Sequence, residues 1–526
     1  MKDSSNKTDL GSTSSSLSGV EVASAARSGV GWMSAERAVS QVIQLAASVA
    51  LARLLVPDDF GLIAMAVAIG GLARAVGDFG VSTLVVQRKS LDSEFLRAAF
   101  TASSTIFLGL AVVQVLLAPL GGLVMGDQRV VGVIVALALA LPLQGLASFL
   151  QALLRRDLAF SKVVKLNLLA VVVTSVVACS LAAKGFGVWS LVAAQIVAPA
   201  SVALVAWRMT SFRMGLDFSA ARRRSREIIS FGKFATGNSI INYLVQNMDY
   251  LLIGRLLPTA QLGFYYFAFE KSRVLSRRVL DLYSSLALPV FSRLNQDSER
   301  IRRAYQSATT AALFFIAPLV AFLAFQARLV IPLVFGEKWL PSVVVFQILS
   351  IHVIVNALTS GIGSVLYAVG RPDISFRIVR WIVVPLGISY FAGARLAGIV
   401  GVAVAVAVVK STFSLVKLGV CFRFLHWQWL PTLRSALVVI AGAVVAGLAS
   451  LGLQGLSPPA NAWIQLVLAA VVYCLVFCLL QVTVNRPGLV VIWQGVLGPG
   501  GLQWCDSRLP VLLRSILSIP GTQASG

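Results

Sequence analysis

The residues best suited to chemistry gather in one apolar segment, residues 261–283. Its charged residues are Glu270, Lys271, Arg273, Arg277, Arg278 and Asp281. Four of them, separated by three, four and four residues, fall within an arc of about 80° on a helical wheel. An ionisable side chain at the centre of a membrane helix costs about 2.5–3.5 kcal/mol, so we expect this stripe to face a wet cavity. Because guanidinium groups bind phosphate oxygens in pairs, the stripe indicates an anion site.

A second apolar segment, residues 60–78, repeats part of this pattern. Arg74 and Asp78 have the same spacing as Arg277 and Asp281, and side chains one helical turn apart are able to form an ion pair. The repeated pair predicts two basic helices facing a common cavity. A structural role is the alternative, because such side chains also reach the membrane surface or hold two halves of a protein together.

A stripe of amide side chains marks the segment 228–254. Its members, Asn238, Asn242, Gln246 and Asp249, again share an arc of about 80°. Amides donate and accept hydrogen bonds and therefore suit a path for sugar hydroxyls. Hydrogen bonding between helices is an equally good interpretation. Asp249 is a candidate for binding a coupling cation or proton, with neutralisation by Arg255 as the alternative.

The first apolar segment, residues 30–53, carries Glu36 and Arg37 about two helical turns inside its start. Arg37 is a further candidate for a phosphate contact. Four acidic residues of the other segments are candidates for ion coupling or for salt bridges. They are Asp78, Asp249, Glu270 and Asp281.

The composition shows which elements must position these residues. Of the 526 residues, 58% are hydrophobic and 12% are charged, and the mean hydropathy is +0.86. Ordinary soluble domains carry about 25% charged residues, so a cytosolic enzyme is excluded. Five cysteines, an odd number, argue against a secreted disulfide scaffold. The chain is predicted to cross a membrane many times.

Fourteen apolar segments have the length of membrane spans. They are residues 30–53, 60–78, 96–118, 130–152, 163–183, 187–207, 228–254, 261–283, 305–327, 342–368, 378–396, 398–420, 435–453 and 462–482. None alternates apolar and polar residues as the strands of a membrane barrel do. We therefore predict an all-α polytopic membrane protein with about 14 transmembrane helices.

The basic residues predict the orientation of these helices. With the N-terminus inside, 37 of the 44 Lys and Arg residues fall on the inner side of the membrane. Inner loops of membrane proteins are enriched in these residues, so both termini are expected in the cytoplasm. The same bias accounts for the net charge of +23 without a nucleic-acid partner.

The first twelve segments contain an internal repeat. RLLVPDDFG at 53–61 corresponds to RLLPTAQLG at 255–263, and DSEFLRAAF at 92–100 corresponds to DSERIRRAY at 297–305. Further matches follow in the same order, with an offset that grows along the chain. Six spans per copy give both copies the same direction in the membrane, so the copies are predicted to be related by a two-fold axis along the membrane normal, with a central substrate cavity.

The repeat divides the chain into predicted parts. They are a disordered tail at 1–28, an N-lobe at 29–207, a basic linker at 208–227, a C-lobe at 228–425, two extra spans within 426–485, and a cytoplasmic tail at 486–526.

Several motifs resemble the oligosaccharide flippases of the MOP superfamily. They include RLLVPDDFG, GDFGVSTLVVQRK, SFGKFATGNSIINYL, QNMDYLLIGR, VFGEKW and GRPDISF. The likeness covers residues 27–485 and is strongest to Wzx-type exporters of the colanic-acid and exopolysaccharide branch. It implies a flippase that moves an undecaprenyl-pyrophosphate-linked oligosaccharide across the bacterial inner membrane by alternating access, with membrane lipids around it.

The resemblance implies roles for the polar residues of these segments. The predicted pyrophosphate contacts are Arg37, Arg74, Arg273, Arg277 and Arg278, and the predicted glycan path is Asn238, Asn242 and Gln246. Na⁺ or H⁺ is a candidate coupling ion, and a polysaccharide polymerase or export machinery is a candidate partner.

Other chemistries lack their motifs. The sequence has no GxxxxGK[ST] loop for ATP, no HExxH or CxxC spacing for a metal, and two histidines in all, so neither a cofactor nor enzymatic activity is expected. The alternative function is an ion-coupled multidrug or metabolite exporter on the same scaffold. Cationic drugs would require a cavity rich in carboxylates, whereas this one is predicted to be rich in arginine.

Overall fold

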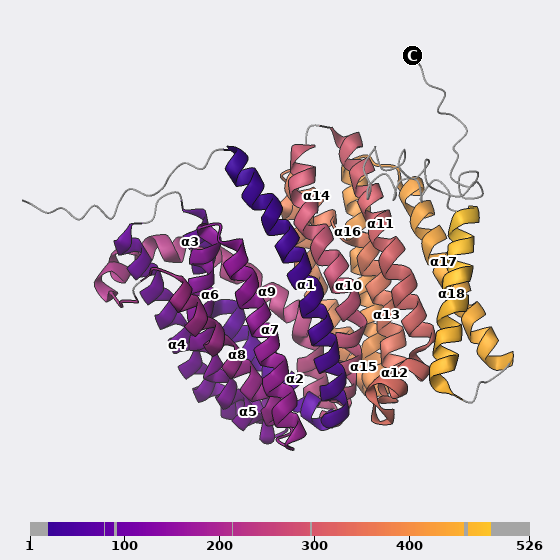
Figure 1. Ribbon diagram of the computed structural model, residues 1–526, viewed down its shortest axis with the longest axis horizontal. Helices are drawn as coiled ribbons and strands as arrows, with labels where there is room; N and C mark the ends of the chain where they lie inside the picture. Colours follow the sequence, from indigo (N-terminus) through magenta and orange to yellow (C-terminus); the bar gives the residue numbers. More distant parts are fainter. Residues whose placement is uncertain are drawn as a thin grey trace, which may run out of the picture. The chain divides into compact units, whose positions relative to one another are not determined.

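The fold was examined in a computed structural model (Figure 1). The structure describes residues 19–77, 79–88, 92–212, 214–294, 297–456 and 461–484. Within these ranges all regular secondary structure is helical and no strand occurs, which confirms the predicted all-α class.

The helices follow one another with short connections. They are α1 (Gly19–Leu54), α2 (Pro57–Gly77), α3 (Val81–Gln87), α4 (Ser93–Met125), α5 (Arg129–Ala138), α6 (Ala140–Arg156), α7 (Phe160–Ala183), α8 (Val188–Met209), α9 (Phe218–Leu256), α10 (Thr259–Arg293), α11 (Ser298–Phe325), α12 (Ala327–Phe335), the 3-10 turn η1 (Glu337–Trp339), α13 (Ser342–Thr359), α14 (Ile362–Ala368), α15 (Pro372–Ala405), the π-helical turn η2 (Val406–Lys410), α16 (Ser411–Phe424), α17 (Trp429–Leu456) and α18 (Ala462–Val484).

Within the described residues, ten helical stretches are long and apolar enough to cross a membrane. One of them, Trp381–Phe424, contains a sharp kink at Ala397 and Gly398, where the sequence predicts the boundary between two spans. The long helices α9 and α10 are not among the ten stretches, and the number fourteen stays a prediction.

The chain separates into two compact units. Unit 1 comprises Met1–Leu51, Ala73–Val115 and Ala136–Gly237, and unit 2 comprises Ala52–Leu72, Leu116–Val135 and Asn238–Gly526. Unit 2 thus includes two short stretches from the first half of the chain. The proposed division into lobes at residues 208–227 stays a prediction.

Unit 1 is held together by an apolar core and by ion pairs at one end. The rings of Phe100, Phe149 and Phe212 pack together with centroids 5.3–5.6 Å apart. Of the predicted basic linker, Arg223 contacts Glu94 at 3.0 Å and Arg224 contacts Asp92 at 3.2 Å. These two arginines therefore tie the start of α9 to the start of α4, in addition to any contact with solvent or lipid.

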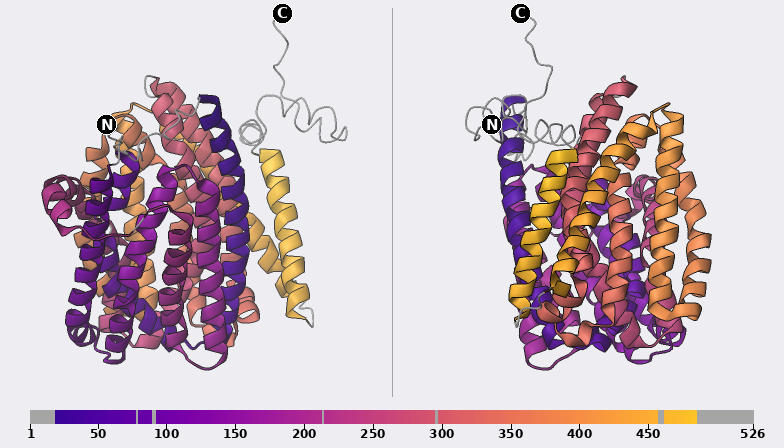
Figure 2. Two further views of the ribbon diagram at one scale, coloured as in Figure 1. Left: turned by 60° about the vertical axis from the view of Figure 1, so that its left-hand side comes forward. Right: turned by 90° about the vertical axis from the view of Figure 1, so that its right-hand side faces the viewer.

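Unit 2 is built around α10, α11 and α13, which lie side by side (Figure 1). The buried Tyr305 hydroxyl on α11 donates to the Leu358 carbonyl at the end of α13, at 2.9 Å. The last two helices complete this unit. α17 packs on α11, and α18 packs on α17 (Figure 2). A buried hydrogen bond of 2.9 Å joins Gln326 to Ser450 on α17.

A reciprocal glycine contact joins the first turns of α2 and α10 inside unit 2. A Cβ atom at Gly61 would overlap the Thr259 carbonyl oxygen, and one at Gly263 would overlap the Pro57 carbonyl oxygen. Both pairs of equivalent residues, Pro57 with Thr259 and Gly61 with Gly263, have the same offset of 202 in the repeat. The two turns thus exchange equivalent contacts, as a two-fold relation between the repeats requires.

Charged residues surround this contact. Arg129 at the start of α5 contacts Asp58 at 2.6 Å and Asp127 at 2.7 Å. Asp127 also accepts a hydrogen bond of 2.8 Å from the Thr259 hydroxyl. The Arg129 guanidinium holds the pKa of Asp127 below its usual value, and Thr259 acts in the same direction. This cluster joins the starts of α2, α5 and α10.

Candidate functional site

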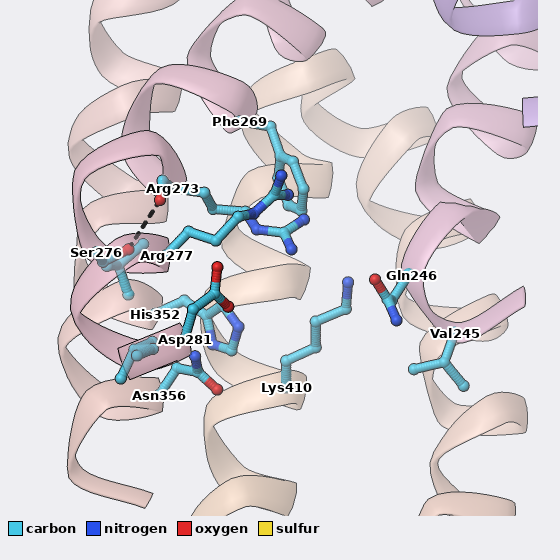
Figure 3. A pocket seen from close by; sticks show the side chains of 12 residues that line it. Val245, Gln246, Phe269, Arg273, Ser276, Arg277, Asp281, His352, Asn356 and Lys410 are labelled. Atoms are coloured by element: carbon cyan, nitrogen blue, oxygen red, sulfur yellow. Dashed lines mark hydrogen bonds between the residues drawn. The ribbon is translucent and has the colours of Figure 1, made fainter. Parts of the chain in front are cut away.

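The site is a cavity of about 590 Å³ within unit 2 (Figure 3). Helices α9, α10, α13 and the turn η2 supply its walls. The lining residues are Val245, Gln246, Phe269, Arg273, Ser276, Arg277, Leu280, Asp281, His352, Val353, Asn356 and Lys410. Figure 3 shows the two guanidinium groups, the Asp281 carboxylate and the Lys410 ammonium group pointing into one space.

Helix α10 supplies the largest share of the wall. Arg273, Arg277 and Asp281 follow one another at four-residue steps, which places them on consecutive turns of one helix face. The Arg273 guanidinium lies 4.9 Å from the centre of the Phe269 ring. A cation over an aromatic face is stabilised by the ring quadrupole, so Phe269 holds Arg273 in place without neutralising it.

Lys410 faces the arginines from the opposite wall. It is the last residue of η2, and π-helical turns are frequent at functional sites. Its ammonium nitrogen lies 5.6 Å from the Phe269 ring centre and 5.8 Å from that of Tyr390. Phe269 thus contacts a cation from each wall. His352 is positioned by a hydrogen bond of 3.1 Å between its Nδ1 and the Ser411 hydroxyl.

The cavity is electropositive. It is lined by three cationic side chains and by one carboxylate, that of Asp281. Among the residues that the structure describes, none of these four groups forms an ion pair. The predicted pair of Arg277 and Asp281 is therefore not formed, although both side chains line the same space. Three cations beside hydrogen-bonding groups have the chemistry that suits a multiply charged anion.

Two acidic residues of the predicted stripes lie elsewhere. Glu270 is outside the cavity lining and lies near the phenols of Tyr250 and Tyr266. Asp249 is fully buried and accepts hydrogen bonds of 2.9 Å from the Tyr265 hydroxyl and 3.0 Å from the Tyr250 amide. Tyr265, rather than Arg255, is the described partner of Asp249. A coupling role for either carboxylate stays a prediction.

The amide stripe of α9 divides in a similar way. Gln246 lines the cavity, whereas Asn242 is half-buried and outside the lining. The side chains of Asn238 and Arg278, and the whole of Asp78, lie outside the described residues.

The two arginines predicted from the first half of the chain belong to unit 1. Arg74 donates to the Gln195 side chain at 3.5 Å, and Arg37 is half-buried on α1 next to Glu36, which accepts a hydrogen bond from Ser40. Their participation in one site with Arg273 and Arg277 stays a prediction.

Four polar lining residues were missed from the sequence: Ser276, His352, Asn356 and Lys410. Lys410 had a usable signal, because it is an ionisable residue inside an apolar span and the same insertion cost applies to it. Asn356 and His352 had none, since their neighbours on α10 and η2 come from distant parts of the chain.

The fold and the cavity together define a multi-pass α-helical membrane protein with an electropositive cavity. Residues 50–344, more than half of the chain, match the family described as polysaccharide biosynthesis protein, and the chain belongs to that family. This confirms the resemblance that the motifs indicate.

Individual relatives agree with this assignment. The chain is 26% identical over 422 residues to the lipopolysaccharide biosynthesis protein WzxC of Escherichia coli (strain K12), covering 77% of this chain and 84% of that protein. It is 23% identical to the teichuronic acid biosynthesis protein TuaB of Bacillus subtilis (strain 168), covering 78% and 86%. The solved structure of the lipid II flippase MurJ in its inward closed conformation has a TM-score of 0.70 at 12% identity, covering 85% of this chain and 98% of that one. This last likeness is one of fold.

Proposed function

We propose that this protein flips a lipid-linked oligosaccharide, an undecaprenyl-pyrophosphate-linked repeat unit, across the bacterial inner membrane for polysaccharide synthesis. The cavity of Arg273, Arg277 and Lys410 binds the pyrophosphate, and alternating access exposes it to each side in turn. The observation that carries the proposal is the excess of cations over carboxylates in the lining of the cavity. The chain that contains this cavity belongs to a family of polysaccharide biosynthesis proteins.

The chemistry of the cavity suits this cargo. A pyrophosphate presents oxygens on two neighbouring phosphorus atoms, and two guanidinium groups on consecutive turns of α10 offer several parallel N–H donors. Lys410 adds a point charge from the opposite wall. The single carboxylate, Asp281, limits the net positive charge and thereby favours release after transport.

The membrane potential supports outward movement of such a cargo. A potential of 100 mV is worth about 2.3 kcal/mol for each charge that crosses the membrane. An inside-negative potential therefore drives an anion outward. Coupling to Na⁺ or H⁺ is then an additional device rather than an energetic requirement.

The proposed location follows the distribution of basic residues. Both termini face the cytoplasm, and the Arg-rich start of α9 lies at the cytoplasmic surface. The protein acts as a carrier without catalysis and delivers its cargo to a polymerase or export machinery outside.

The multidrug or metabolite exporter is the weaker reading of this site. A cationic drug would meet three positive side chains and one carboxylate in the cavity, and desolvating it there would be unfavourable.

A deletion strain provides the test. Spheroplasts are treated with a membrane-impermeant glycan-modifying reagent, and lipid-linked material that stays protected is quantified. Protected material is expected to accumulate without the gene and to fall when the wild-type gene is restored. If drug efflux changes and the protected fraction does not, the exporter is the better assignment.

Variants of Arg277 connect this result to the cavity. Arg277→Gln is expected to reduce export about tenfold, the effect of losing one hydrogen bond to a charged group, and Arg277→Lys to reduce it less because the charge remains. Arg423→Gln, which removes an exposed charge on α16, is the matched control. Normal export by Arg277→Gln at matched protein level would remove Arg277 from the binding site.

A further inference from the structure

A second cavity of about 360 Å³ adjoins the anion site. It lies where α13 ends and α14 begins, opposite α16. Its lining residues are Leu280, Asn356, Thr359, Ser360, Gly361, Gly363, Ser364, Ser414 and Lys417. Leu280 and Asn356 line both cavities, so the two spaces share a wall.

The break between α13 and α14 creates this space. Gly361 has a φ of 79°, a left-handed conformation that interrupts the helix and turns α14 away from the axis of α13. A Cβ atom at Gly361 would also collide with the Tyr283 hydroxyl. The break is therefore fixed by a residue without a side chain, and the hydroxyl-bearing residues on either side of it line the cavity.

The position of Lys417 separates this cavity from the anion site. Lys417 follows Lys410 by seven residues, which places its Cα atom on nearly the same helix face about 10 Å further along the axis. Among the described lining residues, Lys410 lines the anion site and Lys417 lines the second cavity. Each cavity thus has its own lysine.

Lys417 is available to bind a ligand. It is half-buried, and it has no hydrogen bond or ion pair with any other residue that the structure describes. Its ammonium nitrogen lies 3.6 Å from the position of a Cβ atom on Gly363, so it faces the start of α14.

The remaining polar groups form a mixed set of donors and acceptors. The Thr359 hydroxyl already donates to the Val355 carbonyl at 3.2 Å, and the Ser360 hydroxyl donates to the Ala357 carbonyl at 2.8 Å, so their oxygens remain as acceptors. The hydroxyls of Ser364 and Ser414 have no hydrogen bond within the described part of the chain and remain as donors. The Asn356 amide offers both functions.

A mixed set of this kind matches a sugar better than a second phosphate. A phosphate only accepts hydrogen bonds at its ionised oxygens, and acceptors in the wall would repel it. Each sugar hydroxyl both donates and accepts, so it satisfies both kinds of group. We propose that the cavity of Asn356, Ser414 and Lys417 binds the sugar attached directly to the pyrophosphate. This inference rests on the proposed function.

Binding to purified protein in detergent tests the assignment with two probes. The first is undecaprenyl diphosphate, and the second is the lipid-linked repeat unit extracted from the deletion strain. The wild type is expected to bind the repeat unit more tightly than the bare lipid, because the sugar fills the second cavity. Lys417→Gln is expected to reduce this sugar-dependent gain in affinity about tenfold, and Ser414→Ala is expected to reduce it less.

The two probes distinguish the possible failures. Arg277→Gln should weaken both probes equally, whereas Lys417→Gln should leave bare undecaprenyl diphosphate unaffected. Equal weakening of both probes by Lys417→Gln would assign the cavity to phosphate and overturn the sugar assignment. Equal affinity of the wild type for both probes would also overturn it. If neither probe binds, the proposed function itself fails. Arg423→Gln is the control for loss of a positive charge. Unchanged melting temperatures of the variants show that they remain folded.

Discussion

At the scale of single residues, the cavity is distinguished by three cations that form no ion pair with the described residues. Phe269 lies near Arg273 and Lys410 at 4.9 and 5.6 Å and stabilises both charges by its ring. Such contacts are worth about 0.5–2 kcal/mol each and leave every N–H donor free for a ligand. The aromatic ring therefore stabilises these cations without occupying their N–H donors. A carboxylate in an ion pair would instead compete with a bound anion.

Lys410 is expected to contribute as much to binding as either arginine. Lys410→Gln should weaken binding of undecaprenyl diphosphate about tenfold, because the opposite wall loses its only cation among the described lining residues. Lys410→Arg should retain most of the affinity. Isothermal titration of the purified variants measures both effects, and equal affinities of Lys410→Gln and the wild type would show that α10 alone binds the anion.

The spacing of residues within α10 predicted which face of the helix lines a cavity. Arg273, Arg277 and Asp281 share that face because helix geometry alone places them there. Glu270 lies within the same arc of the wheel and is nevertheless outside the cavity lining, although its neighbour Phe269 lines the cavity. A helical wheel gives direction around the axis, but the side chains that reach a cavity also depend on the neighbouring helices. For the same reason, Asn356 and His352 were not predictable.

At the scale of helices, the first turns of α2 and α10 approach each other closely within unit 2. Gly61 and Gly263 allow backbone to contact backbone there, and any side chain at either position would overlap a carbonyl oxygen. The charged cluster of Asp58, Asp127 and Arg129 closes around the same turns. The glycines therefore permit this contact, and the ion pairs around it hold the same turns together.

Substitution of either glycine is expected to separate the two helices. Gly61→Ala and Gly263→Ala should each destabilise the protein by about 1–3 kcal/mol, as overpacking does. The double variant should lose less than the sum, because one displacement relieves both overlaps. Thermal unfolding in detergent measures the three values. Gly109→Ala is the control, since nothing lies within 4 Å of the added methyl group; additive losses would argue against a shared contact.

The charged cluster makes a prediction about pH. The pKa of Asp127 is lowered by Arg129 and then by Thr259, so this carboxylate stabilises the folded state fully above its unfolded pKa of 3.8. Its contribution is lost as the pH falls through the lower folded value. The difference in unfolding temperature between the wild type and Asp127→Asn should therefore be constant from pH 7 to about 5 and shrink below pH 3.8. Asp157→Asn, which changes an exposed carboxylate, provides the comparison; a difference at pH 3 as large as that at pH 7 would contradict the ionic origin.

At the scale of the whole molecule, the sequence predicted the class of fold and its repeat. Apolar length indicates membrane helices because the bilayer sets that length, and the break at Ala397 and Gly398 lies at the predicted boundary between two spans. The compact units were not predictable in the same way. Residues 52–72 and 116–135 come from the predicted N-lobe and pack within unit 2, and this packing depends on contacts such as that of Gly61 with Thr259.

The reciprocal glycine contact also bears on how such a chain is able to evolve. In a dimer of identical six-span units, one glycine would make both contacts, because a two-fold interface presents the same patch twice. A single substitution there would damage the interface in two places at once. In the fused chain the two glycines are separate genetic positions, Gly61 and Gly263, and either is able to change alone. A single chain thus carries this symmetric constraint at two positions that mutate separately, which permits the two halves to diverge while they keep the same contact.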